Sequence, residues 1–180
     1  MQSDKLAPGQ KAPEFSLPGV DGRIHRLSDH LARRKAVVVT FICNHCPYVR
    51  AYIPRLIALQ EQFADDVQIL GISSNDTKAY PEDSFENMKT VSQQWGLNFP
   101  YLWDEDQAVA RSFGAQRTPE IFALDAQGIC QYEGGVDDNF QDPAKVRDQP
   151  LRDALQQIIA GQPVTRPQTW AIGCTIKWKK

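Results

Sequence analysis

Two cysteines, Cys43 and Cys46, stand three positions apart in the sequence Cys-Asn-His-Cys. A C-x-x-C pair beside a strand–helix–strand pattern is typical of thioredoxin-like redox sites. The start of a helix stabilises a thiolate, because its dipole and free N–H groups favour negative charge. Cys43 comes first, so we expect it to attack a substrate disulfide, and Cys46 to resolve the mixed disulfide. The alternative is a pair of buried cysteines at a helix start, with no redox chemistry.

His45 lies between the two cysteines. An imidazolium there would favour the thiolate and make the dithiol couple more oxidising. The alternative is a solvent-facing histidine with little effect. A c-type haem site needs histidine directly after the second cysteine, and Pro47 occupies that position. We therefore expect no cofactor and no resident metal, although Cys43, Cys46 and one imidazole would suit Cu(I) or zinc in a metal-binding module.

Thr118 and Pro119 directly precede an apolar strand. Proline cannot donate to a strand ladder, and a bond before proline adopts the cis form far more readily than other peptide bonds. In a thioredoxin-like arrangement, such a proline packs against the cysteine pair, and the backbone beside it pairs with the substrate. We predict a cis bond in contact with the cysteines. An ordinary proline at the start of a strand is the alternative.

Three further groups could take part in the chemistry. Asp137 and Asp138 follow the last predicted strand, and residues 74–76 follow another strand that ends at the same edge of the sheet. Their acids are candidates for relaying the proton of Cys46, or they are turn and helix-cap residues. Cys174 is a candidate resolving cysteine or a small packing residue, and Cys130 is expected to be structural.

The elements that must position these residues follow from hydrophobic periodicity. The sequence predicts helices over residues 47–63, 82–95, 107–113 and 151–160, and strands over residues 12–17, 20–24, 36–42, 67–73, 120–124 and 129–132. Residues 36–73 form a strand–helix–strand unit, which favours two parallel strands with a right-handed crossover. We predict an α/β, thioredoxin-like fold: a central mixed β-sheet flanked by helices, with an N-terminal β-hairpin and an ordered C-terminal tail.

The length of 180 residues suits one domain over residues 1–180, with a core of about 8–161. The tail, residues 162–180, is predicted to pack on it because it carries four large apolar side chains, Trp170, Ile172, Ile176 and Trp178. A net charge of −2 gives no electrostatic case for nucleic acid or a membrane as a partner. No apolar run is long enough for a signal peptide or a membrane span, so we expect a cytoplasmic protein.

With these residues in place, the sequence resembles the peroxiredoxin-like, thioredoxin-fold proteins of the AhpC/TSA group. It is similar above all to a bacterial branch with a CNHCPYV motif, here residues 43–49, and a C-terminal GCxIKWK motif, here residues 173–179. The resemblance implies a thioredoxin fold, a cis Pro119 and thiol redox activity. Ala36 stands where peroxiredoxins carry a proline, and Pro119 stands where their peroxide-polarising arginine would fall.

The leading hypothesis is a thiol–disulfide oxidoreductase that uses Cys43 and Cys46. Its partners would be a disulfide-containing protein or a small thiol substrate, and a cellular thiol reductant. The second hypothesis is a thiol peroxidase in which peroxide oxidises Cys43 to a sulfenic acid and Cys46 or Cys174 resolves it. The metal-binding module is the third.

Overall fold

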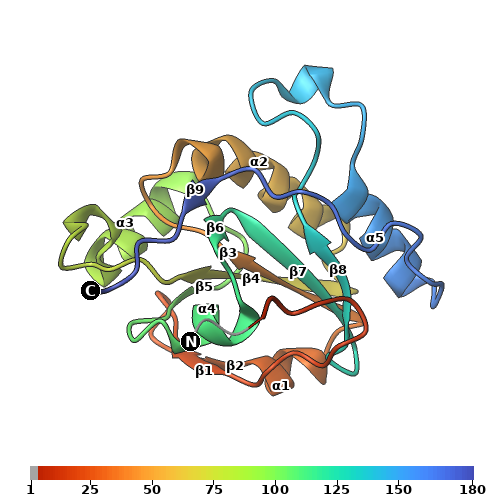
Figure 1. Ribbon diagram of the computed structural model, residues 1–180, viewed down its shortest axis with the longest axis horizontal. Helices are drawn as coiled ribbons and strands as arrows, with labels where there is room; N and C mark the ends of the chain where they lie inside the picture. Colours follow the sequence, from red (N-terminus) through yellow and green to blue (C-terminus); the bar gives the residue numbers. More distant parts are fainter. Residues whose placement is uncertain (1–3) are drawn as a thin grey trace.

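A five-stranded mixed sheet forms the centre of the computed structural model, which describes residues 4–180 (Figure 1). Its strands lie in the order β5-β4-β3-β7-β8: Tyr101–Trp103, Val67–Ser73, Ala36–Phe41, Glu120–Asp125 and Cys130–Gly134. β3 runs parallel to β4, and β4 to β5, whereas β7 is antiparallel to both β3 and β8. The predicted central mixed sheet is confirmed. Met1, Gln2 and Ser3 of the predicted domain lie outside the described residues.

Helices cover both faces of the sheet because β3 alternates its apolar side chains between two cores. Val37, Val39 and Phe41 pack on the side of α1 (Leu27–Leu31) and α4 (Ala108–Phe113). Ala36 and Val38 pack on the other side, with α2 (Pro47–Gln62), α3 (Phe85–Trp95) and α5 (Pro150–Ile159). Successive residues of a strand point to opposite faces, so one run of apolar residues supplies both cores. Cys43 and Cys46 belong to the second core.

The predicted helices and hairpins are present, with shifted ends. The N-terminal hairpin pairs β1 (Ser16–Pro18) with β2 (Ile24–Arg26), and Gly22 supplies the positive φ of +79° in its turn. The helix predicted from residue 82 begins instead at Phe85, because Ser84 Oγ caps it by accepting from the Asn87 N–H. The preceding residues form the 3₁₀ turn η1 (Pro81–Asp83). The sequence analysis did not anticipate α1, β5 or a second 3₁₀ turn, η2 (Pro143–Lys145).

The C-terminal tail crosses the molecule as a mostly extended chain. Figure 1 shows it in blue, running from α5 past β8 and α2 and ending beside α3. Its strand β9 (Cys174–Thr175) pairs antiparallel with β6 (Arg117–Thr118). The predicted packing is confirmed for Ile176, which is 3% exposed, but it is wrong for Trp170 and Ile172, which are 78% and 47% exposed. Hydrogen bonds of the neighbouring Thr169, rather than the indole, hold that part of the tail. Within residues 4–180, no helix combines the length and apolar character needed to cross a bilayer.

Candidate dithiol site

The cysteine pair lies where β3 ends and α2 begins. Phe41 is the last residue of β3 and pairs with Glu120 at the start of β7, which brings residues 118–120 beside the cysteines. The helix starts after Cys46, as predicted, rather than at Cys43. Pro47 is its first residue and Cys46 is its N-cap, because proline lacks the N–H that the first helical position leaves unpaired. The positive end of the helix dipole therefore lies at Cys46 rather than at Cys43.

Thr118 contacts both sulfurs. Cys43 Sγ lies 3.7 Å from Thr118 Oγ1, and Cys46 Sγ lies 3.3 Å from the Thr118 carbonyl oxygen. The Thr118–Pro119 peptide bond is cis, as predicted. The predicted contact between this dipeptide and the cysteines is confirmed through Thr118.

The two thiols share their protons unequally. The pKa of Cys43 is raised, because its thiol hydrogen-bonds to Cys46, because it is buried, and because the Asp83 carboxylate lies near. The pKa of Cys46 is lowered, chiefly because it accepts that bond from Cys43; the Cys174 thiol and the Val49 N–H are further donors, and burial opposes them. The shifts thus favour a thiolate on Cys46 over one on Cys43.

A buried carboxylate, Asp83, holds the segment between the cysteines. Asp83 is fully buried and accepts hydrogen bonds from the Asn44 N–H and from Asn75 Nδ2, both at 2.8 Å. His45 Nδ1 lies 2.6 Å from Asp83 Oδ2. Asn44 Oδ1 accepts a further bond, at 2.8 Å, from the buried hydroxyl of Tyr101. Asp83 was missed because the sequence analysis placed residue 83 inside a helix; the signal was Ser84, a strong N-cap residue that ends the helix there.

These contacts also form a cluster of metal-ligand types. Cys43 Sγ, His45 Nδ1 and an Asp83 oxygen all lie within 4.8 Å of one another. Sulfur, imidazole and carboxylate together suit zinc. The cluster differs from the set considered from sequence, because Asp83 replaces Cys46.

The third thiol lies against the pair. Cys174 Sγ is 2.8 Å from Cys46 Sγ. Burial raises the pKa of the Cys174 thiol, and its contact with Cys46 adds to this. Cys130 is fully buried, and burial raises its pKa to about 12. The structure thus brings Cys174 to the dithiol, while Cys130 packs in the opposite core, on the other face of the sheet.

Comparison with known proteins places this site in a family. A family model described as the AhpC/TSA family matches residues 8–133, which include the cysteine pair and the cis proline. The chain belongs to the AhpC/TSA family. Over 138 residues it is 29% identical to the Mycobacterium tuberculosis protein named "Putative peroxiredoxin Rv2521", covering 77% of this chain and 83% of the relative. Over 126 residues it is 29% identical to the thiol-disulfide oxidoreductase ResA of Geobacillus thermodenitrificans, covering 68% and 66% respectively.

Among solved structures, this AhpC/TSA member is similar to an uncharacterized conserved protein from Geobacillus kaustophilus. The two share 40% identity, with a TM-score of 0.91, over 99% of this chain and 96% of the other. More distant thioredoxin-fold structures, such as the thioredoxin domain of a Bacteroides vulgatus oxidoreductase, show the same fold with a TM-score of 0.62 at 22% identity. The predicted thioredoxin-like fold is confirmed.

The two acids predicted as a proton relay, Asp137 and Asp138, bind other groups in this protein. Asp137 forms an ion pair with Arg55 at 2.8 Å. Arg55 lies nine residues beyond Cys46, or about 13 Å along α2 at 1.5 Å per residue. Asp138 accepts the N–H groups of Arg147 and Asp148. Both acids anchor the loop that follows β8, and these partners favour an anchoring role over the predicted proton relay.

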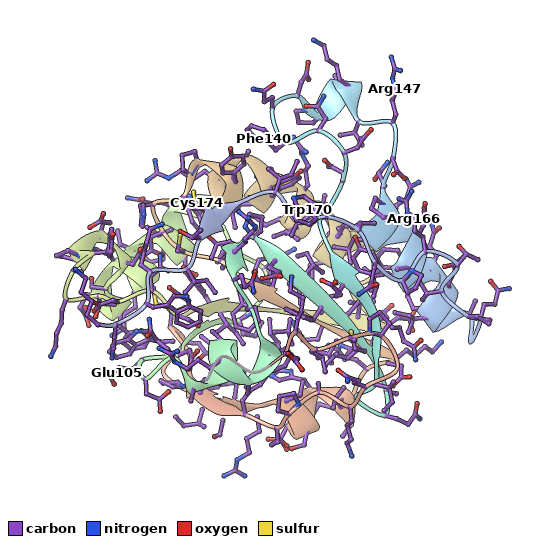
Figure 2. The ribbon with its side chains drawn as sticks, in the orientation of Figure 1. Glu105, Phe140, Arg147, Arg166, Trp170 and Cys174 are labelled. Carbon is purple, nitrogen blue, oxygen red and sulfur yellow. The ribbon has the colours of Figure 1, made fainter. Side chains whose placement is uncertain are left out.

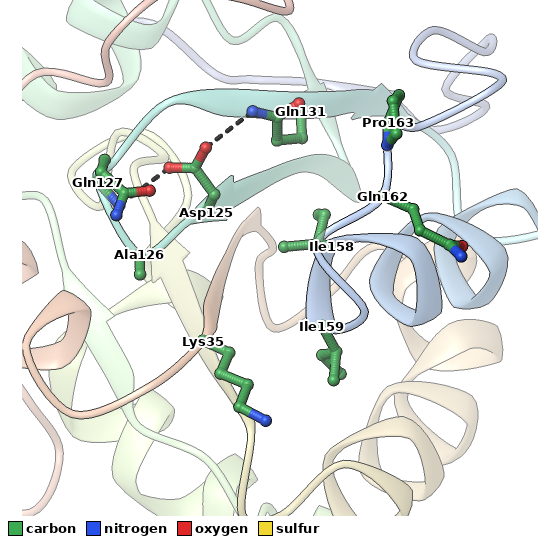
Figure 3. A pocket seen from close by; sticks show the side chains of 10 residues that line it. Lys35, Asp125, Ala126, Gln127, Gln131, Ile158, Ile159, Gln162 and Pro163 are labelled. Carbon is green, nitrogen blue, oxygen red and sulfur yellow. Dashed lines mark hydrogen bonds between the residues drawn. The ribbon is translucent and has the colours of Figure 1, made fainter.

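A surface pocket of about 550 Å³ lies away from the dithiol. Its lining includes Lys35, Asp125 and Ile159, and Figure 3 shows it between the β7–β8 turn and the end of α5. Lys35 precedes β3, whereas Cys43 follows the same strand, so the pocket and the cysteines lie at opposite ends of it. The pocket is therefore separate from the candidate site.

Proposed function

We propose that this protein is a thiol–disulfide oxidoreductase whose redox pair is Cys43 and Cys46. The observation that carries the proposal is the geometry of the pair: Thr118, directly before a cis proline, contacts both sulfurs. The pKa shifts, which favour the thiolate on Cys46 over that on Cys43, agree with a dithiol in which one sulfur accepts the proton of the other. Relatives named as thiol-disulfide oxidoreductases, including ResA, support the same chemistry.

The external attack is assigned to Cys43, because Cys46 Sγ is already in contact with Cys174 Sγ and the Thr118 carbonyl. Cys43 Sγ attacks one sulfur of the substrate disulfide while its proton passes to the Cys46 thiolate. The other substrate sulfur leaves as a thiolate and takes up a proton from water. Cys46 then loses its proton and attacks Cys43 Sγ, which releases the second substrate thiol. The products are a reduced substrate and a Cys43–Cys46 disulfide, which a cellular thiol reductant restores.

Peroxide reduction is a second candidate, favoured by the relative named as a peroxiredoxin. A peroxidatic cysteine must attack as a thiolate. Disulfide exchange needs the same thiolate, so the Asp83 carboxylate near Cys43 slows both reactions and does not separate them. The neighbouring Cys46 supplies the resolving thiol that disulfide exchange requires, and this favours disulfide exchange as the main activity. Zinc binding by Cys43, His45 and Asp83 is a third candidate, because their ligand atoms already converge. Stoichiometric zinc in the purified protein that is lost in His45→Ala would support it.

The substrate is proposed to be a disulfide-containing protein or a small disulfide, and the site of action the cytoplasm. The absence of a disulfide framework among the four cysteines supports a reducing compartment. Fractionation of the native host, with the protein recovered in the cytoplasmic fraction, would test this location.

Trapping with glutathione disulfide tests the proposed function and the order of the two thiols. Cys46→Ser should retain one glutathione on Cys43, because no resolving thiol remains beside it. Cys43→Ser should retain none on Cys46, and Cys130→Ser serves as the control with both site thiols intact. Glutathione retained by Cys43→Ser but not by Cys46→Ser would reverse the roles. No reaction of the wild type with glutathione disulfide or a protein disulfide, with rapid oxidation by peroxide, would replace the function with a peroxidase.

A further inference from the structure

Strand β9 lies where a substrate strand would pair with this site. Thr118, directly before the cis proline, pairs antiparallel with Cys174, and Arg117 pairs with Thr175. Figure 1 shows β9 beside β6, near the start of α2, and Figure 2 shows Cys174 at the same place. The register puts the sulfur of Cys174 at 2.8 Å from Cys46 Sγ. The tail thus presents a thiol to the dithiol from its own backbone-paired strand.

Hydrogen bonds fix the tail on both sides of β9. Before it, the Thr169 N–H donates to the Glu133 carbonyl at 3.1 Å, and the Gly135 N–H donates to Thr169 Oγ1 at 3.1 Å. After it, the Lys177 N–H donates to Asn75 Oδ1 at 2.9 Å, and the Asp76 N–H donates to the Lys177 carbonyl at 2.8 Å. Asn75 also donates to Asp83, so one side chain connects the tail to the carboxylate beside the dithiol. These hydrogen bonds on both sides of β9 fix the position of Cys174 beside the dithiol.

Gly173 makes this close approach sterically feasible. A Cβ built at Gly173 would lie 2.2 Å from the Thr118 carbonyl oxygen and 2.6 Å from its carbonyl carbon. Real Cβ atoms do not approach backbone so closely, so any other residue would push the tail away from Thr118. The glycine next to Cys174 thus allows β9 to pair closely with Thr118.

The tail also covers the site. Cys43 is 1% exposed and Cys46 is 0% exposed, while Cys174 is partly exposed at the surface above them. Of the three, Cys174 is therefore the thiol that faces outward. An external disulfide reaches the buried pair only when the local structure opens.

We propose that Cys174 is a third redox cysteine, which exchanges with the Cys43–Cys46 disulfide and moves the oxidation to a Cys46–Cys174 disulfide. This inference rests on the proposed function, because that reaction supplies the Cys43–Cys46 disulfide. Cys174 loses its proton to water and its thiolate attacks Cys46 Sγ. The Cys43–Cys46 bond breaks, and Cys43 leaves as a thiolate and takes up a proton. One disulfide is consumed and one is formed, so no further oxidant is needed.

The exchange regenerates Cys43 while it ties the tail covalently over the site. The reaction needs the Cys43–Cys46 disulfide, so Cys174 exchanges only after the dithiol has been oxidised.

Disulfide mapping by tryptic digestion tests this directly. Cleavage after Lys35 and Arg50 puts Cys43 and Cys46 on one peptide, residues 36–50, whereas Cys174 falls in residues 153–177. A Cys43–Cys46 disulfide stays inside the first peptide, and a Cys46–Cys174 disulfide joins the two. Cys130 falls in residues 118–145, so any link to that peptide reports unfolding. The protein is oxidised with glutathione disulfide, and the free thiols are blocked in acid before digestion.

We expect the wild type to give both products, and Cys43→Ser to give neither, because it cannot form the Cys43–Cys46 disulfide that Cys174 attacks. Cys174→Ser should give only the internal disulfide. Gly173→Ala should lose the joined peptides while it keeps the internal disulfide. Gly161→Ala meets no atom within 4 Å but strains a backbone φ of +69° away from the dithiol, so it controls for general destabilisation and should keep both disulfide products.

An internal disulfide in the wild type with no joined peptides overturns the third-cysteine proposal and leaves the proposed function standing. Joined peptides in Cys43→Ser would overturn the exchange route, because they would show a Cys46–Cys174 disulfide that forms without the Cys43–Cys46 disulfide. Neither disulfide in the wild type overturns both. If Gly173→Ala fails to fold, the Cys43→Ser and Cys174→Ser results decide the question alone.

Discussion

Replacing Asp83 with asparagine removes a buried charge from beside the dithiol while nearly keeping the side chain's shape. Cys43 Sγ and an Asp83 oxygen lie within 4.8 Å. Two unit charges at that distance interact by about 3.5 kcal/mol at an effective dielectric constant of 20. This corresponds to about 2.5 pKa units at 1.36 kcal/mol per unit. His45, in contact with Asp83, offsets part of this charge, so we expect Asp83→Asn to lower the pKa of Cys43 by about one to two units.

The assay uses the Cys46→Ser background, in which the tryptic peptide 36–50 carries Cys43 alone. Iodoacetamide reacts with the thiolate, so its rate at a series of pH values gives the pKa of Cys43. Asp104→Asn, which alters another fully buried carboxylate, controls for a general loss of stability. A thermal melt confirms that each variant is folded. An unchanged or raised Cys43 pKa in Asp83→Asn would refute the claim that this carboxylate disfavours the Cys43 thiolate.

Three other substitutions test separate parts of the site. Tyr101→Phe removes the buried bond to Asn44 and should cost about 1 to 2 kcal/mol of unfolding free energy in urea; no change would show that this bond does not hold the loop. Asp137→Asn should leave the resolution rate at Cys46 unchanged, whereas a true relay acid would lose about 100-fold or more. His45→Ala should make the redox couple less oxidising in a glutathione equilibrium, by about 30 mV for each 1.4 kcal/mol of lost thiolate stabilisation; an unchanged potential would contradict this.

Much of the fold follows from local signals in the sequence. The run of β-branched residues in β3 and the apolar stripe of α2 predict a buried strand and the helix after it. The ends of elements were less predictable, because they depend on single residues. Pro47 marks the start of α2 where it was predicted, after both cysteines, whereas Ser84 starts α3 after Asp83 instead of before it. The start of α2 places Cys46 at the positive end of the helix dipole. The start of α3 leaves Asp83 outside the helix, where it lies beside the dithiol.

Long-range contacts decided the rest of the site. The C-x-x-C spacing and the Thr118–Pro119 dipeptide have local signatures, and the structure brings them together. Nothing in the spacing of Asp137 shows that Arg55 would bind it, since those residues are 82 positions apart. The pairing of Cys174 with Thr118 is likewise set by the path of the tail, which has no hydrophobic periodicity from which to predict it. Sequence reasoning could name Cys174 as a candidate but could not place it.

Rapid-mixing kinetics test the central claim most directly. The reduced wild-type protein is mixed with either a protein disulfide or hydrogen peroxide at equal concentration, quenched in acid, and analysed as the peptide of residues 36–50. The account predicts faster oxidation by the protein disulfide, with an internal Cys43–Cys46 disulfide as the first protein product. Faster oxidation by peroxide, with a sulfenic acid trapped on Cys43, would contradict it.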